Sequence, residues 1–313
     1  MSSPDTLARP AYRPYVVEVL ESVRLGPSFM RVTLTGEDLE HFGSAGLDQR
    51  IKLLLPGADG RVSEIGQADP ESLSGTAWYE NWRSLPAEER SAMRTYTVRR
   101  IDPAARRLVI DFVLHHDPGP AGGWAEAAVA GDVIVVVGPD ERSPHSRSGI
   151  DWRPGTARRL LLVGDETAVP AIGGIVESLG AGHDVDVFVE VPHADDIPEW
   201  STAANARVRG IAREDAPHGE LLIAAVQQWC AASADVLQRA SAPRPQELAD
   251  IDVDTELLWD SPEDADGDFY AWMAGEAATV KTLRRLLVSA HGVDRKRVAF
   301  MGYWRLGQAE RQE

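Results

Sequence analysis

The chain has 313 residues, of which 43% are hydrophobic, and a formal net charge of −17 at pH 7. That length suits two domains of ordinary size, each able to bury its own core. The negative charge argues against nucleic acid and anionic membrane surfaces as partners, because both repel such a chain at long range. The single cysteine, Cys230, excludes an internal disulfide framework and a cysteine-ligated iron–sulfur cluster. Any redox chemistry therefore needs an organic cofactor or a bound metal complex.

The sequence contains no targeting or membrane-spanning pattern. Residues 1–10 lack an apolar core of signal-peptide length, and nowhere do 18 apolar residues run together. We therefore expect a cytoplasmic protein that does not insert into a membrane, and we expect a monomer.

The first half of the chain is dominated by strand patterns. Residues 57–92 interrupt them as a polar insertion with a predicted helix near 78–85, and a helix is expected just before the last strand. Six strands with this arrangement predict a closed six-stranded antiparallel β-barrel as a domain over residues 1–150. The predicted strands are 13–20, 27–36, 50–56, 94–102, 107–115 and 133–138.

The second half alternates strands and helices, after a linker at 139–157. This alternation predicts an α/β domain over residues 151–313 with a parallel, doubly wound sheet. The acidic, proline-containing run 242–267 is expected to be an exposed loop. The predicted strands are 159–164, 184–190, 207–211, 269–274 and 297–302, and the predicted helices are 168–180, 219–241 and 275–290.

The stretch Arg94-Thr95-Tyr96-Thr97 has a chemically useful pattern. On a strand, Arg94 and Tyr96 share one face, while Thr95 and Thr97 share the other. A guanidinium suits a diphosphate because its planar fork can donate two parallel hydrogen bonds. The alternative is an ordinary solvent-facing strand.

A glycine-rich turn leading into a helix follows the strand predicted at 107–115. Glycines allow a backbone to approach a phosphate closely, and the unpaired N–H groups of a first helical turn attract anions. The alternative is a helix start that simply packs. The residues proposed to bind a cofactor here are His115, Gly119, Ala121, Gly122, Gly123 and Trp124.

Six motifs in order give the chain a resemblance to the siderophore-interacting protein family, the FAD-dependent ferric-siderophore reductases of the ferredoxin-reductase-like superfamily. The motifs are Ile51–Pro56, Arg94–Arg99, Asp111–Trp124, Gly164–Ala171, Ala274–Glu276 and Gly302–Gly307. The resemblance implies that Arg94, Thr95, Tyr96 and Thr97 bind FAD. Arg94 would pair with the FAD diphosphate, the Tyr96 ring would lie against the flavin, and Thr97 would lie near its edge. Two positions depart from the family pattern, which has a small hydroxyl residue in place of Gly122 and a glycine in place of His116.

The resemblance also implies a nicotinamide-nucleotide site at the turn that follows the strand 159–164. No Gly-x-Gly-x-x-Gly stands there; the residues expected to receive the nucleotide are Asp165, Glu166, Thr167 and Ala168. Glu190 could bind an adenosine ribose, whereas Arg207, Arg209 or Arg213 could favour a 2′-phosphate. The choice between NADH and NADPH stays open, with a slight preference for NADPH from the family alone. A domain whose strand ends bind nothing is the alternative.

Lys52 is the best candidate for the substrate pocket, because it interrupts an apolar strand and the family has a basic residue in this motif. Catecholate ferric siderophores are anionic, so a desolvated ammonium would attract them. Further basic candidates are Arg99 and Arg100, and also Lys281 and Arg284, which could form a basic stripe along one helix. For each of these, as for Lys52, the alternative is a solvated surface residue. Tyr303–Arg305 could cover the flavin or the nicotinamide, or pack in the core. No histidine spacing indicates a metal centre.

The predicted function is the reduction of a ferric siderophore. A reduced nicotinamide would pass two electrons to FAD, and Fe(III) in the siderophore would receive them one at a time. Two alternatives remain: a flavin oxidoreductase with another acceptor or with ferredoxin as donor, and a binding module without turnover.

Overall fold

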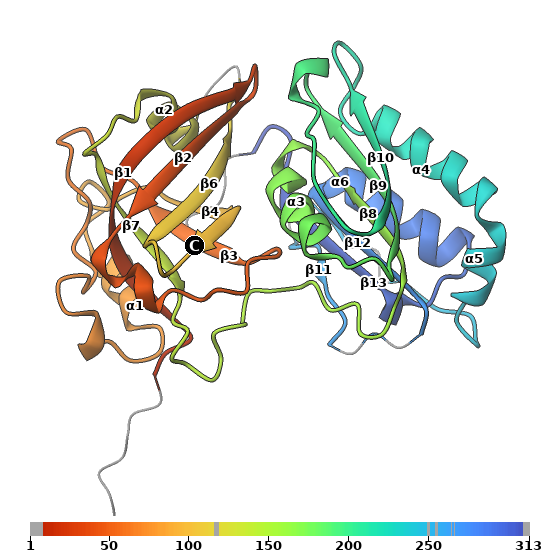
Figure 1. Cartoon of the computed structure of the whole chain (residues 1–313), viewed down its shortest axis with the longest axis horizontal. Helices are drawn as coiled ribbons and strands as arrows, with labels where there is room; N and C mark the ends of the chain where they lie inside the picture. Colours follow the sequence, from red (N-terminus) through yellow and green to blue (C-terminus); the bar gives the residue numbers. More distant parts are fainter. Residues whose placement is uncertain are drawn as a thin grey trace, which may run out of the picture. The chain divides into compact units, whose positions relative to one another are not determined.

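A computed structural model describes residues 9–115, 119–248, 251–253, 256–263, 265 and 267–308 of the chain. The chain forms two compact units, each built around one sheet (Figure 1). The first contains the residues up to Ile150 apart from Gly26–Ser28, and the second contains Gly26–Ser28 and the residues from Asp151 onward. In the described part of the chain, no helix combines the length and apolar character needed to span a bilayer.

The first unit is a curled antiparallel sheet of seven strands in the order β4-β3-β7-β1-β2-β6-β5. Its inward-facing residues form one core, which includes Tyr15, Val32, Ile110 and Phe112. Alternation of buried and exposed positions along β1 shows why these residues form a strand with one side facing the core. The strands are β1 (Tyr12–Gly26), β2 (Phe29–Thr35), β3 (Arg50–Leu54), β4 (Met93–Thr97), β5 (Arg100–Asp102), β6 (Arg107–Val113) and β7 (Val133–Pro139).

The prediction of a closed six-stranded barrel was wrong in two respects: the segment 94–102 forms two strands, and the sheet is an open half-barrel with β4 and β5 at its edges. The Val98 amide donates to the Gln49 carbonyl oxygen, while the next amide, that of Arg99, donates to the Val109 carbonyl oxygen. The chain therefore changes partner, from β3 to β6, between these two residues. As a result β4 and β5, the two edge strands of the sheet, are consecutive in the chain.

The polar insertion after β3 also contributes to the core of the first unit. The helix predicted near 78–85 is confirmed as α1 (Ala77–Ser84), in which Trp82 is buried and donates from Nε1 to the Ser91 carbonyl oxygen. Trp82 packs with Ile65 against Val137 of β7. The insertion thus folds onto the outside of the sheet. The short 3₁₀ helices of this unit are η1 (Glu37–His41) and η2 (Pro70–Ser72).

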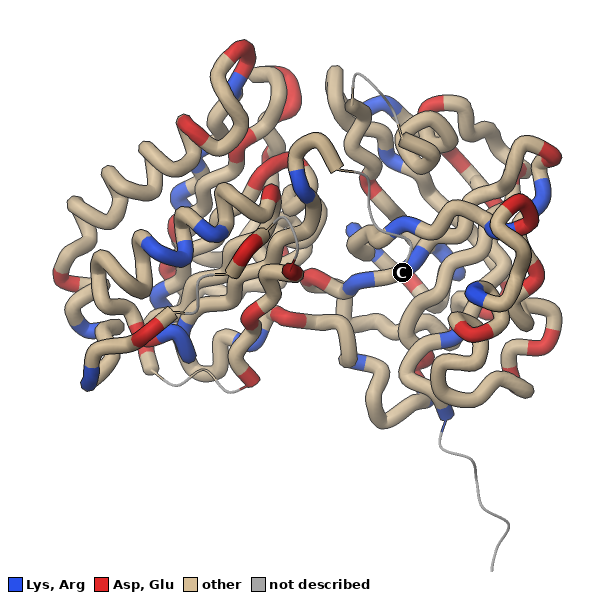
Figure 2. The backbone as a smooth tube through the Cα atoms, turned by 180° about the vertical axis from the view of Figure 1, so that it is seen from behind, with Lys and Arg blue, Asp and Glu red and all other residues tan. Residues whose placement is uncertain are grey.

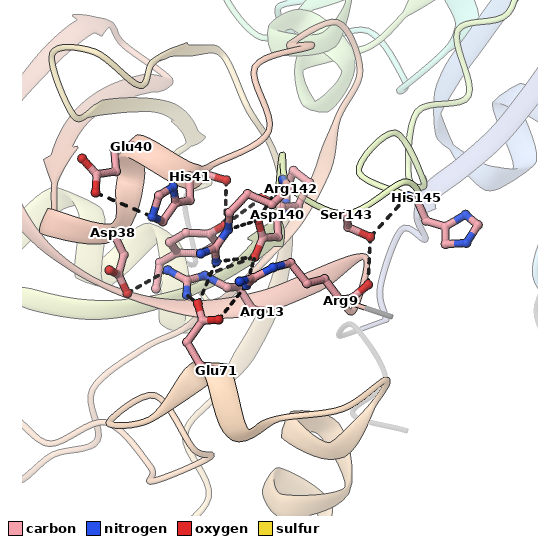
Figure 3. A network of polar contacts seen from close by, with 12 residues as sticks. Arg9, Arg13, Asp38, Glu40, His41, Glu71, Asp140, Arg142, Ser143 and His145 are labelled. Carbon is pink, nitrogen blue, oxygen red and sulfur yellow. Dashed lines mark hydrogen bonds and ion pairs between the residues drawn. The ribbon is translucent and has the colours of Figure 1, made fainter. Parts of the chain in front are cut away.

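A network of charges, in which Arg13 and Asp140 are buried and Glu71 is exposed, ties the insertion to the sheet (Figure 3). Arg13 of β1 lies 3.9 Å from Asp140, which follows β7, and 3.0 Å from Glu71 of η2. Arg142 donates to both Asp140, at 2.7 Å, and Glu71, at 2.8 Å. Because Asp140 is almost fully buried, its charge requires these two guanidinium groups.

The second unit is a six-stranded sheet in the order β10-β9-β8-β12-β13-β11. The helices α4, α5 and α6 cover one face, where Trp229, Leu237 and Val280 pack against the strands. The helix α3 covers the other face (Figure 1). The elements are β8 (Arg159–Gly164), η3 (Glu166–Ala168), α3 (Val169–Ser178), β9 (Asp184–Val191), η4 (Ala194–Asp196), β10 (Asn205–Ala212), α4 (Glu220–Ala232), α5 (Ala234–Arg239), β11 (Trp259–Asp260), β12 (Phe269–Glu276), α6 (Ala277–Arg284), the π-helical turn η5 (Arg285–Ala290), η6 (Arg295–Arg297) and β13 (Val298–Trp304).

Three details differ from the prediction of a purely parallel sheet with an exposed acidic loop. The neighbours from β10 to β13 are parallel, but β11 pairs with β13 in the antiparallel sense, so the sheet is mixed. β11 lies within the run 242–267, where Leu258 is also buried. The helix predicted over 219–241 is interrupted at Ser233, which caps both α4 and α5.

Candidate functional site

An aromatic row in the first unit connects the Arg-Thr-Tyr-Thr strand to the glycine-rich helix. The rings of Tyr96 on β4 and Phe112 on β6 have centroids 4.5 Å apart, and Phe112 lies 5.6 Å from Trp124 of α2 (Pro120–Ala127). Phe112 is fully buried, whereas Tyr96 and Trp124 are half-buried. The two motifs that sequence analysis singled out therefore lie on one continuous side of the sheet.

Arg94 lies two residues before Tyr96, on the same face of β4. Its side chain is half-buried, and Nη1 donates to the Met93 carbonyl oxygen at 2.8 Å. Arginine carries five N–H donors, so this one bond leaves most of the guanidinium fork able to bind an anion. On the opposite face Thr95 is exposed, while Thr97 is buried.

The first turn of α2 has the features of an anion-binding turn. Gly119 precedes it with extended backbone, no side chain of the described residues caps its amides, and Pro120 occupies the first position. A Cβ atom added at Gly119 or Gly123 would meet no atom within 4 Å. Ala121 and Gly122 are buried. His115 is exposed just beyond β6, and the neighbouring His116, Asp117 and Pro118 lie outside the described residues.

These groups fit a dinucleotide such as FAD. A guanidinium and uncapped helix amides are the donors that a diphosphate requires, and two half-buried aromatic rings offer apolar surface to a flavin or its ribityl chain. The space beside Gly119 and Gly123 would let phosphate oxygens approach the backbone.

Lys52 points to the same side of the sheet as Thr95, its partner in the ladder. The ammonium Nζ donates to Thr95 Oγ1 at 2.6 Å, and Lys52 is half-buried. Arg100 is exposed on β5, but Arg99 is only 9% exposed and its Nε lies 3.7 Å from Asp111 Oδ2. Asp111 also accepts two hydrogen bonds from the Arg31 guanidinium, one from Nε and one from Nη2. Arg99 is therefore part of an internal ion cluster.

The expected basic stripe on the last helix does not form. Arg284 is 8% exposed and lies 3.2 Å from Asp260. Lys281 donates to the Ile251 carbonyl oxygen. Both cations thus stabilise contacts within the second unit. The sequence indicated their spacing along the helix but not which side would be covered.

In the second unit, Asp165 organises the turn after β8. Its Oδ1 accepts from the Thr167 amide at 2.9 Å and from the Thr167 hydroxyl at 2.5 Å. Its Oδ2 accepts from the Glu276 amide at 2.6 Å and from Trp304 Nε1 at 2.9 Å. The buried carboxylate therefore connects the ends of β8, β12 and β13. Ala168, at the end of this turn, is also buried.

Glu166, Arg213 and His218 complete a buried charge cluster around Asp165. Both Glu166 oxygens accept from Arg213, at 2.7 and 2.8 Å, and His218 Nε2 lies 3.7 Å from Glu166 and 3.5 Å from Asp165. Burial and the neighbouring Glu166 charge raise the pKa of Asp165 to about 6. Burial alone would lower the pKa of His218, but contact with Glu166 and the charge of Asp165 outweigh it and raise that pKa.

Three potential metal ligands meet in this cluster: Asp165, Glu166 and His218. The four donors on Asp165 already fill its acceptor positions, and Arg213 supplies the positive charge that an ion would bring. The Asp165 carboxylate is therefore already committed to contacts within the chain.

Sequence reasoning missed His218, because no motif includes it. Its ring packs edge-on against Trp304, with centroids 5.1 Å apart. Trp304 was named at the end of the last strand, but its bond to Asp165 depends on the fold.

Glu190 stands at a strand end, as expected, but its carboxylate is engaged within the chain. It is fully buried at the end of β9, and its oxygens accept from the Gly219 amide at 2.8 Å and the Leu222 amide at 3.1 Å. The carboxylate therefore caps α4 and is unavailable to an adenosine ribose. Arg213, a candidate for a 2′-phosphate, is committed to Glu166.

Comparisons with known proteins give one family for both halves of the chain. Residues 18–143 match the model of the siderophore-interacting FAD-binding domain, and residues 157–307 match that of the siderophore-interacting protein. The ferric vibriobactin reductase ViuB of Vibrio cholerae is 26% identical over 297 residues, which cover 95% of this chain and 91% of the relative.

Solved structures show the same architecture. A siderophore utilization protein from T. fusca is 28% identical, with a TM-score of 0.70 and 98% of both chains covered. A ferredoxin NADP+ reductase from Neisseria gonorrhoeae has a TM-score of 0.56 at 13% identity, covering 93% of this chain and 99% of that one. At such low identity the second likeness establishes the ferredoxin-reductase-like fold alone.

Proposed function

Because the chain belongs to the siderophore-interacting protein family, we propose that it reduces ferric siderophores through bound FAD, using a reduced nicotinamide nucleotide and releasing Fe(II) in the cytoplasm. The observation that carries this proposal is the placement of Arg94, the aromatic row and the uncapped start of α2 on one side of the first sheet. The similarity to a ferric vibriobactin reductase supports the choice of acceptor.

In this proposal the residues of the first unit hold FAD and perform no acid–base chemistry. Arg94 and the amides of the first turn of α2 bind the diphosphate, while Tyr96 and Trp124 offer rings to the flavin and its ribityl chain. Thr97 ends the strand that carries Arg94 and Tyr96, and His115 lies between β6 and α2. When bound, FAD accepts two electrons together and can release them singly.

Lys52 is proposed to attract the anionic ferric siderophore. Its half-buried ammonium donates to Thr95, which lies on the opposite face of β4 from Arg94 and Tyr96 but directly between them in the chain. Arg100 is exposed and can add to this attraction, whereas Arg99 is held by Asp111. Hard oxygen ligands bind Fe(II) less firmly than Fe(III), so reduction loosens the complex and no protein ligand for iron is needed.

The turn 165–168 is proposed to lie beside the nicotinamide nucleotide, because open α/β sheets bind ligands at the carboxyl ends of their strands. Asp165, Glu166 and their partners make this turn rigid, and Trp304 closes one side of it.

The decisive experiment follows the two half-reactions separately. Purified protein should be yellow, should bleach under anaerobic conditions with NADH or NADPH, and should regain its colour when ferric siderophore is added. A ferrous chelator should then capture Fe(II) only in the presence of siderophore. Yellow protein that no nicotinamide bleaches, but that reduced ferredoxin does, would contradict the donor; colourless protein that takes up no FAD would contradict the whole proposal.

A further inference from the structure

The carboxyl edge of β8, β9 and β10 in the second unit is strongly acidic. The segments that follow these strands, 164–168, 190–196 and 213–220, contain two, three and three acidic residues, respectively. Arg213 is the one arginine or lysine in these three segments, and the histidines are His193 and His218. A ligand approaching this edge therefore meets a negative field.

At two helix starts on this edge, carboxylates of the chain already occupy backbone amides that a phosphate would use. Glu190 accepts from the Gly219 and Leu222 amides at the start of α4. Glu214 accepts from the Ala194 amide at 3.2 Å, at the start of η4. Helix N-termini bind phosphates through such amides, so these two starts are closed to a phosphate.

The cations near this edge are also committed. Arg213 binds Glu166 and lies 3.9 Å from Glu190, and His193 Nδ1 lies 3.2 Å from Glu214. Arg207 of β10 pairs with Asp184 and Asp186, at the opposite end of β9. Arg209 lies 3.5 Å from Gln228 and aligns with Phe188, three residues short of the carboxyl end of β9.

From this arrangement we propose that the carboxyl edge selects NADH over NADPH as the electron donor. The two nucleotides differ by the 2′-phosphate of the adenosine ribose, which carries nearly two negative charges at neutral pH. In related α/β sheets, acidic residues beyond the strand ends suit NAD, and arginine accommodates the phosphate of NADP. The exposed carboxylates of Asp195, Glu214 and Asp215 provide the repulsion. The inference rests on the proposed use of a nicotinamide donor.

Binding of NAD+ and NADP+ to the FAD-containing protein, measured by titration calorimetry, tests this without turnover. At low ionic strength NAD+ should bind at least roughly tenfold more tightly than NADP+. Added salt should reduce this ratio of affinities, because it screens the carboxylates. The double variant Asp195→Lys and Asp215→Lys should gain affinity for NADP+ severalfold more than for NAD+. Both positions are exposed.

Asp235→Lys is the matched control, because Asp235 is exposed on α5, beyond the far end of α4. This variant should leave the ratio of NAD+ and NADP+ affinities unchanged. Equal or tighter binding of NADP+ at low salt would overturn the inference, as would a ratio that neither salt nor the double variant alters. If neither nucleotide binds, the inference fails too; reduction of ferric siderophore by dithionite-reduced protein then shows separately whether the acceptor half of the proposed function stands.

Discussion

Lys52 and Thr95 face each other across β3 and β4, and their contact gives the sharpest residue-level test of the acceptor site. Replacing Lys52 by Ala should raise the apparent KM for an anionic ferric siderophore roughly three- to tenfold, the effect of losing one partly exposed charge contact. FAD content and reduction by nicotinamide should stay nearly the same. Steady-state kinetics and stopped-flow reduction measure the two effects.

Lys52→Arg, which retains the charge, should recover most of the affinity for siderophore. Equal losses in both half-reactions of Lys52→Ala would place this side chain in the cofactor site or in the core instead.

Arg94 gives the corresponding test of the cofactor site. Arg94→Ala should weaken FAD binding by about 1–3 kcal/mol, the usual contribution of a charge-assisted hydrogen bond. Equilibrium dialysis of FAD against the apoprotein measures the change. Arg107→Ala, at an exposed position of β6, is the control and should bind FAD normally. Unchanged affinity in a folded Arg94→Ala protein would rule out the assigned role.

At the scale of elements, the start of α2 contains a helical glycine with open space beside it. Gly123 lies inside a helix, where Ala would be more favourable by up to ~1 kcal/mol, yet the space beside it is open. Gly123→Ala should therefore keep or raise the stability of the apoprotein while weakening FAD binding roughly fivefold or more. Thermal unfolding and FAD titration test both parts.

Gly180→Ala is a useful comparison, because its added Cβ also meets no atom within 4 Å. That variant should leave FAD affinity unchanged. Normal affinity in Gly123→Ala would show that the diphosphate does not approach this part of the helix.

The charge network of Figure 3 should make the first unit sensitive to acid. Burial alone would raise the pKa of Asp140, but the bonds and charge of Arg142 and the charge of Arg13 lower it below its ordinary value of 3.8. The unfolded chain then binds the proton first as the pH falls. The stabilisation that ionised Asp140 gains from Arg142 and Arg13 is thus complete above about pH 4 and is lost progressively below it.

Asp140→Asn should therefore destabilise the protein by about 1–3 kcal/mol at pH 7, because two guanidinium groups lose their buried partner. Its stability should also depend less on pH below 4 than that of the natural sequence. Urea midpoints between pH 3 and pH 7 measure both effects. Glu21→Gln, at an exposed position of β1, should show neither; an unchanged acid profile in Asp140→Asn would remove the network from the explanation.

At the scale of the whole molecule, the net charge of −17 opposes the capture of an anionic substrate. Acidic positions are spread over both units (Figure 2). If a local basic site at Lys52 governs capture, anionic ferric siderophores should be reduced faster at low than at high ionic strength, because salt screens charges over roughly 10 Å at 0.1 M. Stopped-flow rates across a salt series test this. Rates that rise with salt would mean that the acidic surface controls the encounter.

The sequence by itself determined most of the elements and the family. The strand predicted at 159–164 is β8, and α1 and α3 lie where their patterns indicated them, because alternation and helical periodicity are local properties. The six motifs indicated the siderophore-interacting family, which the family models confirm. Local patterns could not show that the segment 94–102 changes partner, nor that a two-residue strand, β11, forms inside an acidic run.

Only the tertiary structure decided which charged residues are available to a ligand. Glu190 and Arg284 have charged side chains that suit ligand binding, but both are buried in contacts with segments distant in the sequence. His218 belongs to no motif, and it joins the Asp165 turn because β8 and the start of α4 meet at the same edge of the sheet. The physical reason is that a charge must find its partner once burial removes water, and the partner is chosen by packing in three dimensions.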